Sequence, residues 1–152
     1  MPVKVRIEIS PDTEEEIIIK CRELDEHTQK IRDMLEDLSK VDSELLLFIG
    51  NTEYYIKKSD ILFFEISDHK VFAHTKDKML RTEHKLFELE DIMPSYFVRI
   101  SKSVIANVKL ISSLSRELTG NGKITFKSSD KFTYFSRGYY KKLKDKIDEV
   151  RF

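Results

Sequence analysis

Apolar residues recur in short runs along most of this 152-residue chain, either consecutively or at every second position. Both patterns are typical of β-strands, with two buried faces or one. They predict strands at residues 45–49, 53–57, 60–66, 69–75, 78–82, 97–100, 104–106, 112–117, 123–127 and 131–135. Gly50-Asn51 and Thr119-Gly120-Asn121-Gly122 are turn signals between strands. We therefore expect a mostly β fold of the α+β class.

Apolar residues spaced three and four positions apart predict three helices. These helices are expected at residues 25–39, 86–92 and 139–150. Pro94 ends the second helix, because proline cannot continue a helix. The first helix carries an apolar stripe made of Leu24, Ile31, Met34, Leu35 and Leu38.

The first 42 residues read as a small strand-strand-helix appendage to a main domain at residues 43–152. Residues 3–9 alternate strictly, which predicts a strand with Val3, Val5, Ile7 and Ile9 on one face. Residues 14–21 are ambiguous, because a glutamate run can open a helix whereas Ile17-Ile18-Ile19 favours a strand. We favour a strand that pairs back on the first one.

The composition places the chain among globular proteins, with 40% hydrophobic and 36% charged residues. No run approaches the ~18 consecutive apolar residues of a membrane span, and residues 1–7 lack the apolar core of a signal peptide. Cys21 is the one cysteine, so no intramolecular disulfide can form. These features lead us to expect a cytoplasmic protein.

The net charge of zero hides an asymmetry along the chain. Residues 1–42 carry 7 Lys/Arg and 12 Asp/Glu, whereas residues 43–152 carry 20 and 15. Within residues 97–144 there are 11 Lys/Arg against only Glu117 and Asp130. Such a basic segment is expected of a phosphate-binding surface, although a solvated lysine-rich surface gives the same count.

No group of residues in the sequence has the spacing of a catalytic or metal site. His69 and His74 would lie on opposite faces of one strand, and the glycines form no phosphate-binding loop before a helix. Cys21 has no activating base nearby in the sequence. We expect neither an enzyme nor a bound metal or cofactor.

Residues 97–111 carry the most informative motif of the chain. Phe97-Val98-Arg99-Ile100 alternates as a strand, Ser101-Lys102-Ser103 interrupts it with short polar donors around a cation, and an apolar stretch then runs to Asn107. The pattern Phe97-x-Arg99-x-x-Lys102-Ser103-x-Ile105-x-Asn107-x-x-x-Ile111 resembles the signature of the LytTR family of bacterial DNA-binding domains.

Two further segments carry the same resemblance, which runs from about residue 45 to the C-terminus. They are the upstream residues 60–65 and the downstream Phe132 with Ser136-Arg137. Two positions depart from the commonest family pattern, because Ser101 stands where histidine is frequent and Ala106 where valine is frequent.

The resemblance implies an elongated β domain that binds double-stranded DNA at direct repeats. Loops at strand ends would enter successive major grooves, in place of a recognition helix. The family's contacting positions fall on His69, Lys102 and Arg137 of this chain. It also implies a sequence-specific transcriptional regulator, and some small regulators of this kind answer to an inhibitory membrane protein encoded nearby.

Side-chain chemistry suggests a role for each candidate. The planar fork of Arg137 suits guanine O6 and N7, whereas Lys102 is a flexible point charge with less selectivity. His69 can donate to a base or to a phosphate. The candidate phosphate contacts are Lys70, Ser101, Ser103, Ser136 and Tyr139. Arg99 and Asn107 match family positions and contact DNA or hold local structure.

Two rival functions remain open at this point. One is an RNA- or single-strand-binding protein that stacks bases on Phe132, Tyr134 and Phe135, although core packing is the better interpretation for most of these rings. The other is a protein-interaction adaptor that acts through its acidic appendage. For the appendage itself we consider homodimerisation, docking of a regulatory partner, or simple packing against the main domain.

Overall fold

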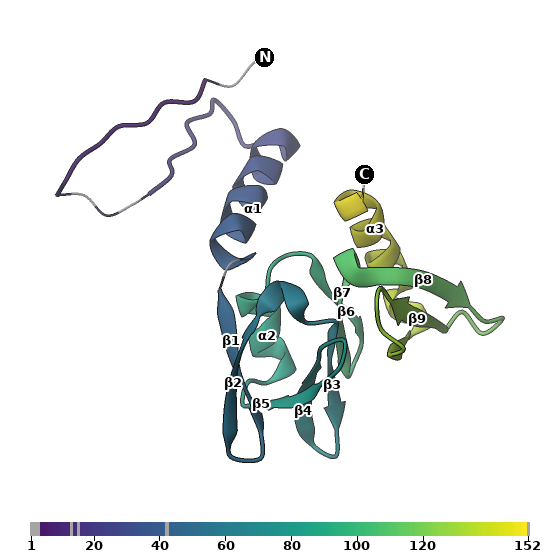
Figure 1. Cartoon of the computed structure of the whole chain (residues 1–152). Helices are drawn as coiled ribbons and strands as arrows, with labels where there is room; N and C mark the ends of the chain where they lie inside the picture. The colour runs from purple at the N-terminus through teal and green to yellow at the C-terminus, as the bar shows by residue number, and fades with distance from the viewer. Residues whose placement is uncertain (1–3, 13, 15, 42, 152) are drawn as a thin grey trace.

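The structure is a computed structural model that describes residues 4–12, 14, 16–41 and 43–151, with the backbone alone for residues 39–41 (Figure 1). Its helices are α1 (Glu26–Val41), α2 (Leu86–Ile92) and α3 (Tyr140–Arg151). Its strands are β1 (Glu44–Ile49), β2 (Thr52–Lys57), β3 (Phe63–Ser67), β4 (Lys70–His74), β5 (Met79–Thr82), β6 (Phe97–Ser101), β7 (Val104–Asn107), β8 (Ile111–Arg116), β9 (Gly122–Phe126) and β10 (Phe132–Phe135).

Seven of the strands form one antiparallel sheet in the order β2-β1-β5-β4-β3-β7-β6. Most neighbours are consecutive hairpins, as the short loops between the apolar runs require. The exception that matters for the site is the pairing of β3 with β7, which sets Phe64 opposite Ile105. This pairing brings two hairpins that are distant in sequence to neighbouring positions in the sheet.

The other three strands form a small antiparallel sheet in the order β10-β9-β8, beside α3 (Figure 1). Two apolar cores hold the parts together. One includes Phe63, Ile100 and Ile124 and is covered by α3 through Leu143. The other includes Leu47 and Phe64 and is covered by α2 through Leu86 and Leu89. Because β3 presents Phe63 to one core and Phe64 to the other, it joins the two.

The main domain confirms the expected mostly β fold. Every strand predicted from residue 45 onwards is present, and α2 and α3 lie within one residue of their predicted bounds. The helix expected at residues 25–39 is present as α1. The proposed boundary between appendage and main domain falls at Asp42, which lies outside the described residues.

The two strands predicted in the appendage are wrong. Residues 4–10 and 16–21 have no regular secondary structure, and Val3 lies outside the described residues. The reason is physical: Val5, Ile7 and Ile9 are 89%, 85% and 92% exposed, so no strand or apolar surface among the described residues covers them. An alternating segment without a hydrogen-bonded neighbour does not form a stable strand.

Gly122 is a position where the small sheet leaves no room for a side chain. A Cβ added there would lie 2.1 Å from the Ser115 carbonyl oxygen and 2.4 Å from Cζ of Phe135. We expect Gly122→Ala to lower the free energy of unfolding by about 1–3 kcal/mol, because the buried Phe135 ring and the strand must move apart. Urea unfolding measures this difference.

Gly138→Ala is the matched control for that substitution. A Cβ at Gly138 meets nothing within 4 Å, so the midpoint of unfolding should stay close to that of the wild type. Equal stability of the two variants would contradict the packing described for Gly122.

Candidate nucleic-acid interface

Two of the predicted contact residues lie in two-residue hairpin loops. Ser67 pairs with Lys70, so Asp68 and His69 form the loop between β3 and β4. Both have positive φ, at 52° and 62°, which is the left-handed geometry that a tight hairpin turn needs and that Asp and His tolerate better than most residues. His69 is therefore fixed at the exposed tip of a rigid hairpin.

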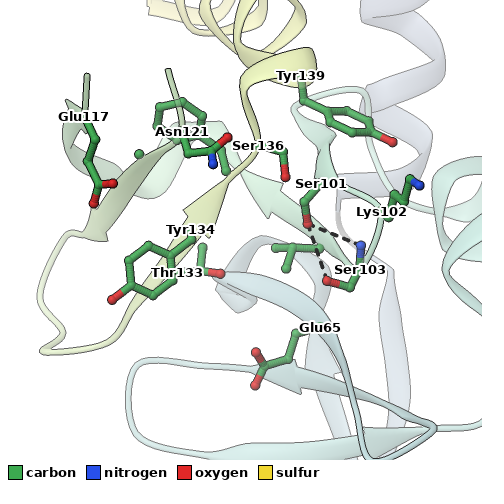
Figure 2. Close-up of a pocket in the computed structure, with 13 residues that line it drawn as sticks. Glu65, Ser101, Lys102, Ser103, Glu117, Asn121, Thr133, Tyr134, Ser136 and Tyr139 are labelled. Atoms are coloured by element: carbon green, nitrogen blue, oxygen red, sulfur yellow. Dashed lines mark hydrogen bonds between the residues drawn. The ribbon is translucent and has the colours of Figure 1, made fainter. Parts of the chain in front are cut away.

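The loop between β6 and β7 is built in the same way. Ser101 pairs with Val104, which leaves Lys102 and Ser103 as the turn. Ser101 is 9% exposed, and its hydroxyl accepts a hydrogen bond from the Ser103 amide at 3.2 Å (Figure 2). The hydroxyl of the buried Ser101 thus stabilises the turn, while the Lys102 side chain stays exposed.

A third segment, which follows β10, is attached beside this turn. The Ser136 amide donates to the Ile100 carbonyl at 3.0 Å, and the Tyr139 amide donates back to Ser136 at 2.9 Å. On the other side, the Ile66 amide donates to the Ser103 carbonyl at 2.9 Å. Three segments from different parts of the sequence therefore meet, and we call residues 67–70, 101–103 and 136–139 together the loop face.

A cleft of about 640 Å³ opens between the second and third segments of the loop face and the adjoining strands β9 and β10 (Figure 2). Five predicted site residues line it, namely Ser101, Lys102, Ser103, Ser136 and Tyr139. His69, Lys70 and Arg137 are exposed and lie in the same segments without lining the cleft. The structure therefore brings five of the ten predicted site residues, from two segments more than thirty positions apart in the sequence, to one cleft.

Arg99 hydrogen-bonds to the backbone of the loop that carries Lys102. Its Nε donates to the Ser101 carbonyl at 3.1 Å, its Nη2 donates to the Lys102 carbonyl at 2.9 Å, and its Nη1 pairs with Glu90 of α2 at 3.0 Å. Each of the three guanidinium nitrogens therefore has a hydrogen-bond partner within the chain. Arg99 is therefore a positioning residue for the loop at Lys102.

Asn107 is not placed to contact DNA, because its side chain is only 1% exposed. Its Nδ2 donates to the Ile61 carbonyl at 3.0 Å, and its Oδ1 accepts from the Lys109 amide at 3.0 Å. The amide thus joins the end of β7 to the segment before β3. Of the two roles considered from the sequence, the structural one fits.

Asn121 is a residue of the site that the sequence pattern does not single out. Its Oδ1 accepts a hydrogen bond from the Arg137 amide at 2.8 Å, which fixes the start of the third segment. The aliphatic part of Arg137 lies over Gly120, where an added Cβ would be 2.7 Å from Cγ and Cδ. The turn signal at residues 119–122 marked a hairpin, but nothing in it indicated a contact with Arg137.

Several cations of the basic segment are engaged in packing. Lys109 lies over the ring of Tyr96 at 4.3 Å, Arg116 over Tyr140 at 3.9 Å and Lys123 over Phe132 at 4.1 Å, measured to the ring centroids. These three cations keep their charge but lie outside the loop face, so the count over residues 97–144 includes charges that the loop face does not carry.

The aromatic residues of β10 correct the expectation of core packing. Phe135 is buried, but Phe132 is 45% exposed and Tyr134 is 57% exposed. The cause is strand alternation, since Thr133 and Phe135 point inward and their neighbours point out. Tyr134 lines the cleft opposite Lys102 and Tyr139 (Figure 2).

Two carboxylates, Glu65 and Glu117, also line the cleft. Glu65 is held by His74, whose Nε2 donates to Oε1 at 2.7 Å, while Nζ of Lys131 lies 3.2 Å from Nδ1 of the same ring. An ammonium group can donate to Nδ1 only when the imidazole is neutral. In agreement, burial lowers the pKa of His74 below its ordinary value of 6.5, against the opposing effect of Glu65.

This arrangement predicts a loss of stability at mildly acidic pH. Above pH 6.5 the imidazole is neutral in both states, but below it the unfolded chain takes up a proton that the folded His74 binds less readily. The free energy of unfolding should therefore fall as the pH drops from 6.5 towards the lower folded pKa. Urea titrations at about pH 7.5 and about pH 5.5 measure the effect.

His74→Gln serves as the control, since it keeps a polar side chain that does not titrate. Its stability should differ less between the two pH values than that of the wild type. An equal pH dependence in both proteins would contradict the neutral, buried state assigned to His74.

Within the part of the chain that the structure describes, no group of three or more His, Cys, Asp or Glu could hold a metal ion. Among the same residues, no helix has the length and apolar character needed to cross a membrane.

Comparison with known proteins identifies the family. The model of the LytTr DNA-binding domain matches residues 51–148. Proteins of Staphylococcus aureus strains N315 and MRSA252, each named an uncharacterised HTH-type transcriptional regulator, are 32% identical to this chain over 136 residues, which is 90% of this chain and 91% of each relative. The fold is also similar to a solved LytTr DNA-binding domain from Bacillus cereus, with a TM-score of 0.64 at 18% identity over 69% of this chain and 96% of that one. This chain therefore belongs to the LytTR family of DNA-binding domains.

Proposed function

We propose that this DNA-binding transcriptional regulator reads specific double-stranded DNA through its loop face. The observation that carries the proposal is the meeting of three exposed segments, residues 67–70, 101–103 and 136–139, through the hydrogen bonds of Ile66 to Ser103 and of Ser136 to Ile100. Each segment presents a cation or a histidine from a rigid support. Such a constellation can be pre-ordered for DNA without a recognition helix.

The order of elements supports recognition by loops. In the described chain, strands separate α1 from α2 and α2 from α3, so no two α-helices follow one another as a helix-turn-helix unit. A two-residue hairpin tip is narrow enough to enter a major groove about 12 Å wide. We therefore infer that the loops at His69 and Lys102 and the segment at Arg137 enter the DNA, with direct repeats as the target arrangement that the family resemblance implies.

The side chains of the loop face can be divided into those assigned to bases and those assigned to the phosphate backbone. Arg137, exposed and steadied by Asn121, is assigned to guanine, and Lys102 to a base or a phosphate at the tip of its loop. Lys70, Ser103, Ser136 and Tyr139 are assigned to the phosphate backbone. Glu65 and Glu117 repel phosphate, so we place the backbone at the rim of the cleft. Ser101 keeps a role in shaping the loop.

Binding of this kind depends on salt. Neutralised phosphates release counterions, so the affinity should fall by powers of ten as the salt concentration rises. The decline should be linear on a double-logarithmic plot, with a slope that reports the number of phosphates contacted.

Binding of single-stranded nucleic acid is a second candidate function, and one specific observation favours it. The exposed pair Phe132 and Tyr134, with Lys123 over the Phe132 ring, can stack unpaired bases. Competition of unlabelled duplex DNA, single-stranded DNA and RNA for a bound labelled duplex separates the two functions. We expect duplex DNA to compete best, whereas stronger competition by single strands, lost on Phe132→Ala, would overturn the proposal.

A further inference from the structure

The appendage exposes an unusual amount of apolar surface. Of the large apolar side chains that are exposed in the described chain, half lie within residues 5–38, namely Val5, Ile7, Ile9, Ile17, Ile18, Ile19, Leu24, Met34 and Leu38. Figure 1 shows the segment before α1 extending away from both sheets. Exposed apolar side chains grouped in one part of a chain mark an interaction site.

Helix α1 is attached to the main domain by one face only. The Ser95 amide donates to Oδ1 of Asp37 at 3.0 Å, and the Ser95 hydroxyl donates to Oδ2. Ile31 and Leu35 are half-buried, whereas Met34 and Leu38 are each 66% exposed, and Leu24, just before the helix, is 67% exposed. Its 16 residues span about 24 Å, so the helix holds residues 4–9 away from the sheets of its own chain.

Residues 4–9 are complementary to themselves in one antiparallel register. With Ile7 opposite Ile7 of a second copy, Val5 faces Ile9 and Arg6 faces Glu8, twice over by symmetry. In the single chain Arg6 and Glu8 already pair on one face, at 2.6 Å. Opposite charges and β-branched residues across from one another stabilise a strand pair.

Neighbouring registers are less complementary. A shift of two residues in one direction pairs Lys4 with Glu8 but also sets Arg6 against Arg6, and in the other direction it sets Glu8 against Glu8 and leaves Arg6 opposite Ser10. A shift of one residue sets apolar side chains against charged ones. The charge pattern therefore selects a symmetric contact, and a symmetric contact fits a second copy of this chain better than an unrelated partner.

We propose that two copies of the chain associate through their appendages, with residues 4–9 of each copy paired antiparallel about a two-fold axis at Ile7. Pairing supplies the hydrogen-bonded neighbour whose absence leaves this alternating segment without strand structure in the single chain. The exposed stripe of α1 and the isoleucines at residues 17–19 cover the apolar face of the pair. The inference is independent of the DNA contacts proposed above.

Charge reversal in the full-length protein tests the register. Sedimentation velocity over a concentration series should show a dimer for the wild type. Arg6→Glu and Glu8→Arg should each raise the dimer dissociation constant about tenfold or more, because each creates like-charge pairs twice. The double variant Arg6→Glu with Glu8→Arg should restore the dimer dissociation constant of the wild type. Lys57→Glu, on exposed β2, is the control that leaves association unchanged.

A cross-linking experiment tests the axis directly. In a Cys21→Ser background, Ile7→Cys should give a disulfide-linked dimer on mild oxidation, whereas Leu118→Cys, fully exposed in the main domain, should give none. A wild type that stays monomeric at all concentrations, or a dimer that is insensitive to both single charge reversals, would overturn the proposal. Arg137→Ala should keep the dimer, which separates this outcome from a failure of DNA recognition.

Discussion

Replacing Arg137 by alanine should lower the affinity for the preferred duplex by about 1–3 kcal/mol, which is roughly 5- to 150-fold, and should abolish discrimination at one base pair. The guanidinium is the one exposed fork in the third segment of the loop face, and a fork bonded to guanine O6 and N7 cannot be replaced by water without loss. The fold should survive, because the bond to Asn121 uses the Arg137 backbone amide.

Fluorescence anisotropy with the preferred duplex and with single-base variants measures both effects. Arg137→Lys is the matched control, since it keeps the charge and loses the fork. It should retain most of the non-specific affinity but little of the discrimination. If both variants discriminated between duplexes as the wild type does, the assignment of Arg137 to base recognition would be wrong.

Replacing Arg99 by alanine should weaken binding to every duplex alike. Its guanidinium holds the carbonyls of Ser101 and Lys102, and loss of these two bonds frees the loop that presents Lys102. We expect about tenfold lower affinity and a loss of about 1–3 kcal/mol in the free energy of unfolding, because the carbonyls lose their charged donor.

Glu90→Gln shows whether the losses of affinity and stability in Arg99→Ala come from the two carbonyl bonds or from the salt bridge with Glu90. Glu90→Gln keeps both carbonyl bonds and removes only a partly exposed ion pair, which is worth little. Its DNA affinity should stay near that of the wild type in anisotropy titrations. A large loss in Glu90→Gln with none in Arg99→Ala would show that the carbonyl bonds do not position the loop.

The fold of the main domain could be predicted because its signals are local. Alternation, consecutive apolar runs and turn residues define hairpins between residues close in sequence, and all ten strands follow this rule. The appendage could not be predicted in the same way. Its alternating segment has the pattern of a strand, but a strand also needs a neighbour, and the pattern does not say whether that neighbour lies in the same chain.

The sequence indicated where the candidate residues lie better than it indicated their contacts. His69 and Lys102 lie in hairpin loops and Arg137 follows the last strand, and the family resemblance pointed to all three positions. Tertiary contacts set the rest: Asn107 is buried, Arg99 binds carbonyls and Asn121 supports Arg137. The contact between His74 and Lys131 joins residues 57 positions apart, and no spacing in the sequence indicates it.

Amide chemical-shift mapping during titration with the preferred duplex shows which residues the DNA contacts. We expect the largest perturbations on residues 67–70, 101–103 and 136–139, while the turn at Gly50 and Asn51, at the opposite margin of the large sheet, stays unchanged. Perturbations centred on Gly50, on α1 or on Phe132 and Tyr134, with the loop face unaffected, would contradict DNA recognition through the loop face.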